Sequence, residues 1–188
     1  MKRLVILVML VMSCVAASAQ RTASGSSCIT ANGLFTVPGL SFGGEVDYSR
    51  YMLNGYWFAG ASVTNRGYVD NVFKTYVDHQ RAAAVGGIMF RLVSSYNRFF
   101  SLYGGVDAFA GVGMLDLFKT MPENARKYYL ENGHKEVSFI YGGSPRLEME
   151  FYLSELFAIT VLGRVPFCGS SGFDWVSLET GVGVRFNF

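Results

Sequence analysis

The residues best suited to chemistry in this chain are acids and arginines that alternate with apolar residues. Ten of them share the polar positions of such segments: Glu45, Asp47, Arg91, Asp107, Arg146, Glu148, Glu150, Arg164, Glu179 and Arg185. A guanidinium binds a carboxylate through two parallel hydrogen bonds, so arginines and acids can satisfy one another away from water. The set therefore predicts an internal charge network rather than a catalytic centre.

Catalytic and cofactor motifs are otherwise weak. His79 could act with Asp78, and His134 with Glu136, as in eight-stranded lipid-modifying enzymes of the outer membrane. Both histidines fall in predicted loops, where a solvated histidine is the ordinary interpretation. The sequence contains no metal-ligand cluster, Walker loop or Gly-x-Gly-x-x-Gly fingerprint. We therefore expect a protein without enzymatic activity, cofactor or metal.

The charged residues alternate with apolar ones because the elements that carry them are strands. Residues 176–188 show this best, with one apolar parity: Val176, Leu178, Thr180, Val182, Val184, Phe186 and Phe188. Successive strand side chains point to opposite faces, so this strand has one apolar face and one polar and glycine face. Lipid outside and a polar lumen inside produce that pattern, although a strand of a soluble sandwich or lipocalin-like barrel is the alternative. Phe186 and Phe188 also resemble the C-terminal insertion signal of outer-membrane proteins.

Comparable segments recur along the chain. Seven are recognisable: 40–50, 55–63, 82–93, 100–113, 137–152, 157–167 and 176–188. Bacterial outer-membrane barrels have an even number of strands, so an eighth is needed, and residues 29–37 before Pro38-Gly39 are the candidate. The sequence predicts an all-β fold, an eight-stranded antiparallel transmembrane β-barrel of up-and-down topology.

The connections alternate in length. They are short at 51–54, 94–98 and 154–155, long at 67–80 and 114–136, and intermediate at 168–174. Short periplasmic turns and longer extracellular loops give this alternation. Within 114–136, Pro122 is placed to begin a surface helix and Asn132-Gly133 to end it.

Aromatic residues gather at both strand ends and predict two interfacial girdles. Those near the short turns are Tyr48, Tyr51, Tyr56, Trp57, Phe99, Phe100, Phe151, Tyr152, Phe157, Phe186 and Phe188. Those near the long loops are Phe35, Tyr68, Phe139, Tyr141, Phe167 and Trp175. An eight-stranded barrel has just enough interior for side chains, which disfavours the alternative of an open ion or substrate channel.

The N-terminus predicts export. Lys2 and Arg3 precede a short apolar run, and Ala17-Ser18-Ala19 offers a cleavage site, so residues 1–19 are expected to be a cleaved signal peptide and residues 20–188 one barrel domain. Lipoprotein processing at Cys14 is the rival interpretation.

The mature chain loses two of the 16 basic residues and none of the 14 acids, which leaves 14 of each. A net charge of zero gives no reason to expect direct contact with nucleic acid. Cys28 and Cys168 should be free thiols, because the predicted topology puts them at opposite ends of a membrane band about 25 Å tall.

Several of these segments together resemble the TraO family of conjugative-transposon transfer proteins. They are residues 138–143, 146–157, 163–164 and 181–188, and the length, signal peptide and Ala-Gln-Arg junction at 19–21 also fit. The resemblance implies a non-enzymatic component of a conjugation apparatus in the outer membrane of a Gram-negative cell. Its implied partners are outer-membrane lipid, the barrel-insertion machinery and other transfer proteins. The alternatives are a small OmpX/OmpA-like surface barrel for adhesion or envelope integrity and, from another class, the lipid-modifying enzyme.

Overall fold

The computed structural model describes seven stretches of the chain, residues 24–37, 41–69, 76–95, 99–115, 122–131, 135–169 and 175–188. The predicted signal peptide, Cys14 and His134 lie outside these residues.

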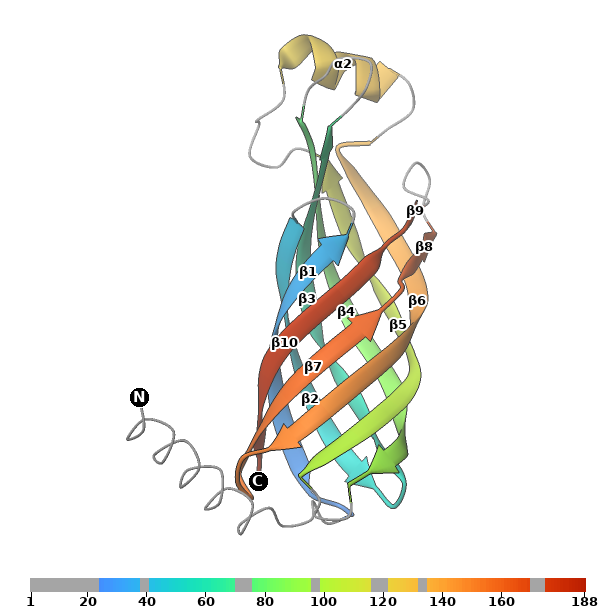
Figure 1. Ribbon diagram of the computed structural model, residues 1–188. Coiled ribbons are helices and arrows are strands. Elements are labelled where there is room, and N and C mark those ends of the chain that lie inside the picture. The colour runs from blue at the N-terminus through green and yellow to red at the C-terminus, as the bar shows by residue number, and fades with distance from the viewer. Residues whose placement is uncertain are drawn as a thin grey trace, which may run out of the picture.

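Strands form a single closed sheet (Figure 1). They are β1 (Ser27–Val37), β2 (Ser41–Met52), β3 (Gly55–Val69), β4 (Tyr76–Ser94), β5 (Phe100–Leu115), β6 (Val137–Tyr152), β7 (Phe157–Arg164), β8 (Phe167–Gly169), β9 (Trp175–Val176) and β10 (Leu178–Asn187). Strands β1 to β7 pair antiparallel in sequence order, β10 pairs antiparallel with β7, and β1 closes the ring against β10. Helix α2 (Glu123–Glu131) lies above one end of the barrel (Figure 1).

The ten strands make eight barrel positions. On β6, the register that pairs Arg146 with Arg164 of β7 continues to pair Tyr141 with Gly169 of β8. The pairing of β9 with β8 likewise continues that of β10 with β7. Two of the eight strands are thus interrupted rather than duplicated. The predicted eight-stranded antiparallel barrel, including its first strand, is confirmed.

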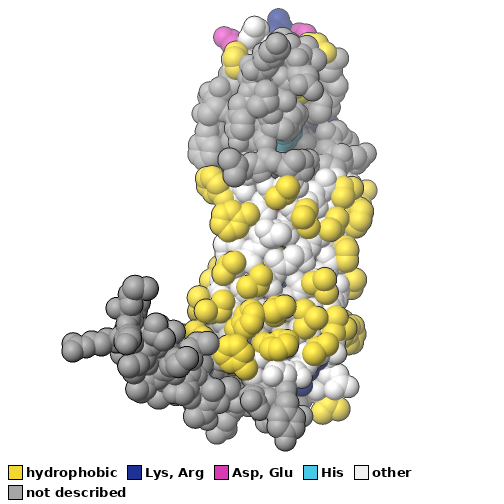
Figure 2. Space-filling view, viewed as in Figure 1, with side chains coloured by type: hydrophobic (Ala, Val, Ile, Leu, Met, Phe, Trp, Pro, Cys, Tyr) yellow, Lys and Arg dark blue, Asp and Glu magenta, His cyan; other side chains and the backbone are white. Residues whose placement is uncertain are grey.

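The barrel is apolar outside and polar inside. On β1, Thr30 and Asn32 are buried in the lumen, whereas Ile29 and Phe35 are about half exposed on the exterior. Apolar side chains surround the visible outer wall (Figure 2). Because the sheet closes on itself, such a wall can lie in lipid without leaving the backbone groups of a sheet edge unpaired. None of the described helices is long and apolar enough to span a membrane.

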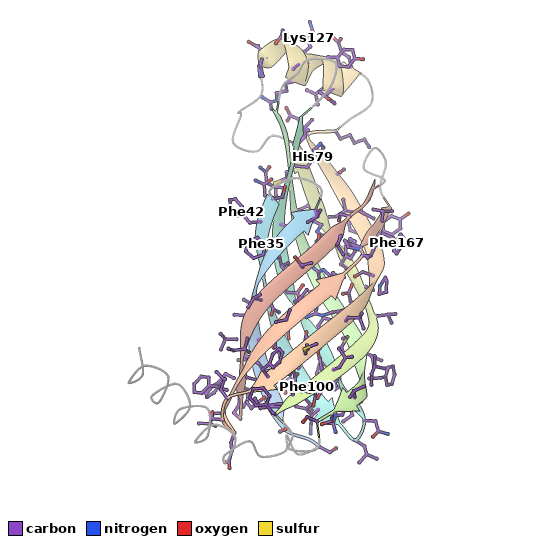
Figure 3. The ribbon with its side chains drawn as sticks, viewed as in Figure 1. Phe35, Phe42, His79, Phe100, Lys127 and Phe167 are labelled. Atoms are coloured by element: carbon purple, nitrogen blue, oxygen red, sulfur yellow. The ribbon has the colours of Figure 1, made fainter. Side chains whose placement is uncertain are left out.

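Aromatic residues do lie on the exterior at both ends. Near the short turns, Trp57, Phe157 and Phe186 are exposed. Phe35 and Phe167 lie toward the long-loop end, well away from Phe100 (Figure 3). The side chains of Tyr68 and Trp175 are outside the described residues.

Three tyrosines predicted for the outer girdle are instead buried inside the barrel: Tyr51, Tyr56 and Tyr152. That prediction was wrong because these residues share the parity of the lumen-facing polar residues on their strands, whereas the sequence interpretation placed them only by their distance from the short turns. Their hydroxyl groups then find carboxylate acceptors inside.

The predicted loop at 67–80 is mostly strand. β3 and β4 pair without a break from Gly55 opposite Phe90 to Val69 opposite Tyr76. The prediction missed these strand residues because a strand that extends beyond the lipid needs no apolar face. The alternation of apolar and polar residues that identifies a strand is therefore weaker there. The helix predicted within 114–136 is confirmed, and its first turn is closed by the N–H of Arg126 donating to the carbonyl of Pro122.

Several glycines allow neighbouring strands to approach closely. A Cβ on Gly105 would lie 2.1 Å from the carbonyl oxygen of Ile88, and one on Gly60 would lie 2.2 Å from that of Val46. Real Cβ atoms essentially never come so near, so these positions exclude any side chain. At Gly163, by contrast, a Cβ would meet nothing within 4 Å.

We predict that Gly105→Ala destabilises the barrel by about 1–3 kcal/mol, because a backbone atom must move to make room. Gly163→Ala is the matched control and should change the unfolding free energy by less than about 0.5 kcal/mol. Urea unfolding of the two variants in detergent micelles measures the difference. Equal stabilities would contradict the close approach of β4 and β5.

Candidate functional site

Eight charged side chains in the lumen form a continuous series of ion pairs, which we call the interior ion-pair chain. In order along it, they are Arg81, Glu179, Arg164, Glu45, Arg146, Glu148, Arg185 and Glu150. Each successive pair carries opposite charges, and the residues come from β2, β4, β6, β7 and β10. The chain therefore connects strands that are far apart in sequence across the inside of the barrel.

Glu45 is the central member. Its two carboxylate oxygens accept separate bonds, from Arg146 Nη1 at 2.7 Å and from Arg164 Nη1 at 2.6 Å. Arg164 also donates from Nε to Glu179 at 2.8 Å. Arg81 extends the chain by donating to Glu179 at 2.9 Å. One carboxylate thus holds two arginines that approach it from β6 and β7.

The other half of the chain runs toward the short turns. Glu148 accepts from Arg146 at 2.8 Å and from Arg185 at 2.7 Å, and Arg185 is also paired with Glu150. All eight side chains are at most 5% exposed. In such surroundings each charge depends on its partners, because water does not replace them.

Tyrosines fill the lumen at the short-turn end. Tyr56 donates its hydroxyl hydrogen to Glu148 at 2.6 Å, and Tyr51 donates to Glu150 at 3.0 Å. The guanidinium of Arg185 lies 4.7 Å from the centre of the Tyr56 ring, a cation–π contact. Side chains therefore occupy the lumen at this level, which argues against an open channel through it.

The ten residues predicted for the interior charge network do not all join the interior ion-pair chain. Seven of them belong to the interior ion-pair chain: Glu45, Arg146, Glu148, Glu150, Arg164, Glu179 and Arg185. Asp107 lies beside it, accepting from Ser144 and standing 3.7 Å from Arg164. Asp47 accepts from Ser49 at 2.9 Å and has no ion pair within the described chain.

Arg91 departs from the predicted network. Its guanidinium lies 5.8 Å from the centre of the Tyr103 ring and pairs with none of the described carboxylates. The register of β4 against β5 shifts between Arg91 and Val93, so the strand is irregular where it leaves the lumen.

Arg81, rather than Arg91, is the fourth arginine of the interior ion-pair chain, and it was not predicted. It lies between the predicted loop at 67–80 and the predicted strand at 82–93, so it was assigned to neither. Its parity with Ala83 and Gly87 could have revealed that it faces the lumen.

The remaining candidates for chemistry are scattered. His79 lies in β4 rather than in a loop, opposite Arg66 of β3, so its predicted placement was wrong. The described part of the chain contains no group of three or more histidine, cysteine, aspartate or glutamate residues that could hold a metal. Cys28 and Cys168 do not form the disulfide that the predicted topology excludes, and both are buried.

The C-terminus completes the barrel seam. Phe188 donates its N–H to the carbonyl of Ser27 at 2.9 Å, and Ser27 returns a bond of 3.1 Å to Phe188. The centre of the Phe186 ring lies 5.2 Å from that of Phe157 on the exterior, with the two ring planes tilted by 58°. Both Phe186 and Phe188 are exposed there.

We predict that Glu45→Ala destabilises the barrel by about 3–5 kcal/mol, because it leaves two buried arginines without their shared carboxylate. Glu131→Ala, which removes a solvent-exposed acid 3.9 Å from Lys127, is the control and should change stability by less than about 0.5 kcal/mol. Urea unfolding in micelles distinguishes them. A Glu45 variant as stable as the control would show that the ion pairs are not coupled in solution.

Comparison with known structures agrees with the geometry. The chain is similar to Neisserial surface protein A, with 11% identity and a TM-score of 0.62 over 90% of this chain and all of that one. It also resembles OprG of Pseudomonas aeruginosa, with 11% identity and a TM-score of 0.58 over 88% of this chain and 96% of that one. A third is Ail, the attachment invasion locus protein of Yersinia pestis, with 16% identity and a TM-score of 0.51 over 88% of this chain and all of that one.

These likenesses show a small outer-membrane β-barrel fold. No curated protein sequence matches the chain. A family model, described as conjugative transposon protein TraO, matches residues 29–188, which include the barrel from the third residue of β1 onward. The chain belongs to the TraO family of conjugative transposon proteins.

Proposed function

We propose that this protein is a non-enzymatic component of the outer membrane that supports conjugal DNA transfer by anchoring or by contact. The proposal rests on which parts of the barrel can contact other proteins. The wall is apolar and the lumen is filled by the interior ion-pair chain, so only the two ends are available to other proteins. Membership in a conjugative-transposon family suggests that those contacts would serve conjugation.

The proposal also covers how the protein reaches its place. Residues 1–19 would direct export and be removed, leaving residues 20–188 as the barrel. Phe186 and Phe188 would be read by the barrel-insertion machinery. Outer-membrane lipid and other transfer proteins would then be its partners, and the neutral mature chain would not contact DNA directly.

Helix α2 is the most prominent feature beyond the barrel wall. Its Ala125 and Tyr129 side chains are buried, whereas Tyr128 is 43% and Leu130 36% exposed. An ion pair between Arg126 and Glu136 ties the helix to the residue that precedes β6. The helix is thus held by its buried face, and Tyr128 and Leu130 are partly exposed on either side of that face, which suits contact with an envelope protein or a recipient cell.

A second candidate is a surface barrel for adhesion or envelope integrity. The fold shared with Ail and Neisserial surface protein A favours it, because their names describe attachment and a surface location. Genes flanking this one separate the two: transfer genes support conjugation, whereas a solitary gene beside envelope-stress loci supports the alternative.

We predict that the double variant Tyr128→Ser, Leu130→Ser lowers transfer frequency at least about tenfold, the equivalent of about 1.4 kcal/mol of lost contact energy. The matched control on the same helix is Lys127→Ser, Glu131→Ser, which removes two exposed charged residues and should transfer normally. Surface levels and folding are checked by whole-cell labelling and by gel mobility before and after boiling.

Normal transfer by a donor that lacks the entire gene would contradict the role in conjugation. Normal transfer by the double variant, together with loss of transfer in the gene deletion, would remove α2 from the contact and move the search to the short turns.

A further inference from the structure

A groove runs along the outer wall of the barrel over β1 to β4, and we call it the wall groove. It consists of two hollows, one of about 550 Å³ and one of about 330 Å³. The hollows adjoin, because Gly44 and Val63 line both of them. The first extends to Ala31 of β1, and the second extends toward the long-loop end as far as Asn65 and Gln80. Each has the size of a small-molecule site.

The wall groove exists because small residues meet at one level of four neighbouring strands. The register places Ala31, Val46, Ala61 and Ala84 in one row across β1 to β4. Gly44 lies in the next outward-facing row toward the long loops, and all five residues are exposed on the outer face. Their short side chains leave the wall recessed at this level.

Aromatic residues lie beyond both ends of the recessed rows. Toward the long loops, Phe35 and Phe42 are exposed on the outer wall (Figure 3). Toward the short turns, the ring centres of Tyr48 and Trp57 lie 5.7 Å apart. Aromatic girdles mark the two interfaces of a membrane, so the recessed rows between them lie at the level of the hydrocarbon. An acyl chain is the occupant that fits this part of the wall groove, because water and polar ligands do not enter the hydrocarbon layer.

The end of the wall groove nearest the long loops is polar. Asn65 of β3 pairs with Gln80 of β4, and both residues line the second hollow. Within the described part of the chain, the buried Oδ1 atom of Asn65 has no hydrogen-bond partner. An amide oxygen only accepts hydrogen bonds, and a buried acceptor without a bond is unfavourable. The occupant should therefore carry an N–H or O–H donor at the end of its acyl chain.

This requirement distinguishes between membrane lipids. Glycerophospholipids join their chains through esters, which accept hydrogen bonds and donate none. Lipid A, the membrane anchor of lipopolysaccharide, joins some of its chains through amides, and the amide N–H is a donor. Lipopolysaccharide also occupies the extracellular leaflet, which is the leaflet that the long-loop end of a barrel reaches.

We propose that the wall groove binds one amide-linked acyl chain of lipid A. The amide N–H of the lipid would donate to Oδ1 of Asn65, and the chain would lie over Gly44, Val63 and Ala61. This inference rests on the outer-membrane placement proposed above, and it names the lipid that the outer wall selects.

The test uses the full mature protein in detergent micelles. Lipid A and dipalmitoyl phosphatidylethanolamine are titrated separately, and bound lipid is counted by native mass spectrometry. Gly44→Leu fills the wall groove without moving the backbone, because a Cβ there lies 3.7 Å from its nearest atom. Gly163→Leu is the matched control on β7, where a Cβ meets nothing within 4 Å. Gel mobility before and after boiling checks that each variant is folded.

We expect the wild type and Gly163→Leu to bind lipid A alike, and Gly44→Leu to bind it at least about tenfold more weakly. Asn65→Leu removes the acceptor, so it should weaken lipid A about fivefold and leave phosphatidylethanolamine unchanged. Equal affinity of the wild type for the two lipids, or equal binding of lipid A by the two leucine variants of glycine, would overturn the proposal.

Photocrosslinking on the wild type decides the matter even if a variant misfolds. Lipid A that carries a diazirine on its amide-linked chains should label residues 42–46, 61–65 and 80–82, and should leave residues 157–163 of β7 unlabelled. Labelling spread evenly around the wall would contradict a bound chain.

The outcome can be separated from that of the proposed function. Loss of transfer in the gene deletion, with no preference for lipid A, would contradict the wall groove alone. Selective binding of lipid A, with normal transfer by the gene deletion, would keep the lipid site and contradict the role in conjugation.

Discussion

Closure of the sheet between β1 and β10 is the constraint on which the rest of the structure depends. In lipid an unpaired backbone group costs several kcal/mol, so a spanning sheet must end on its own first strand. The bonds between Phe188 and Ser27 complete that ring at the last residue of the chain. Closure also creates an interior that is cut off from both lipid and bulk water.

That interior explains the ion pairs. Eight strands enclose only enough room for side chains, so polar residues facing inward must satisfy one another. Glu45 and Glu148 each do so by holding two arginines. A chain of buried ion pairs is weak evidence of high stability, because desolvation offsets much of the attraction. It does favour one register, since slipping any strand by one residue would turn its charges into the lipid.

Much of this fold could be predicted from the sequence, because a membrane wall imposes strict alternation. The eight strands, the absence of a disulfide between Cys28 and Cys168, and helix α2 followed from parity, chain geometry and a proline start signal. The upper parts of β3 and β4 could not be recognised, because strands in water lose the apolar face that marks them. The partner of each interior charge could not be predicted either, since pairing Arg81 with Glu179 requires knowledge of strand order and shear as well as parity.

The division of roles within the molecule follows from these constraints. A wall in lipid and a filled lumen leave the parts that project, such as α2, as the surfaces through which the proposed contacts would be made. Ail and Neisserial surface protein A share the barrel at low identity, so the same scaffold can carry unrelated ends. The family relation, rather than the fold, connects this chain to conjugation.

The central claim is that the mature chain is a closed barrel in the outer membrane. Its most direct test is electrophoresis of isolated outer membranes with and without boiling. The account predicts that the protein fractionates with outer membrane, migrates as a compact folded form when unheated and shifts to the mobility of the unfolded mature chain after boiling. A soluble periplasmic protein whose mobility does not depend on heating would contradict it.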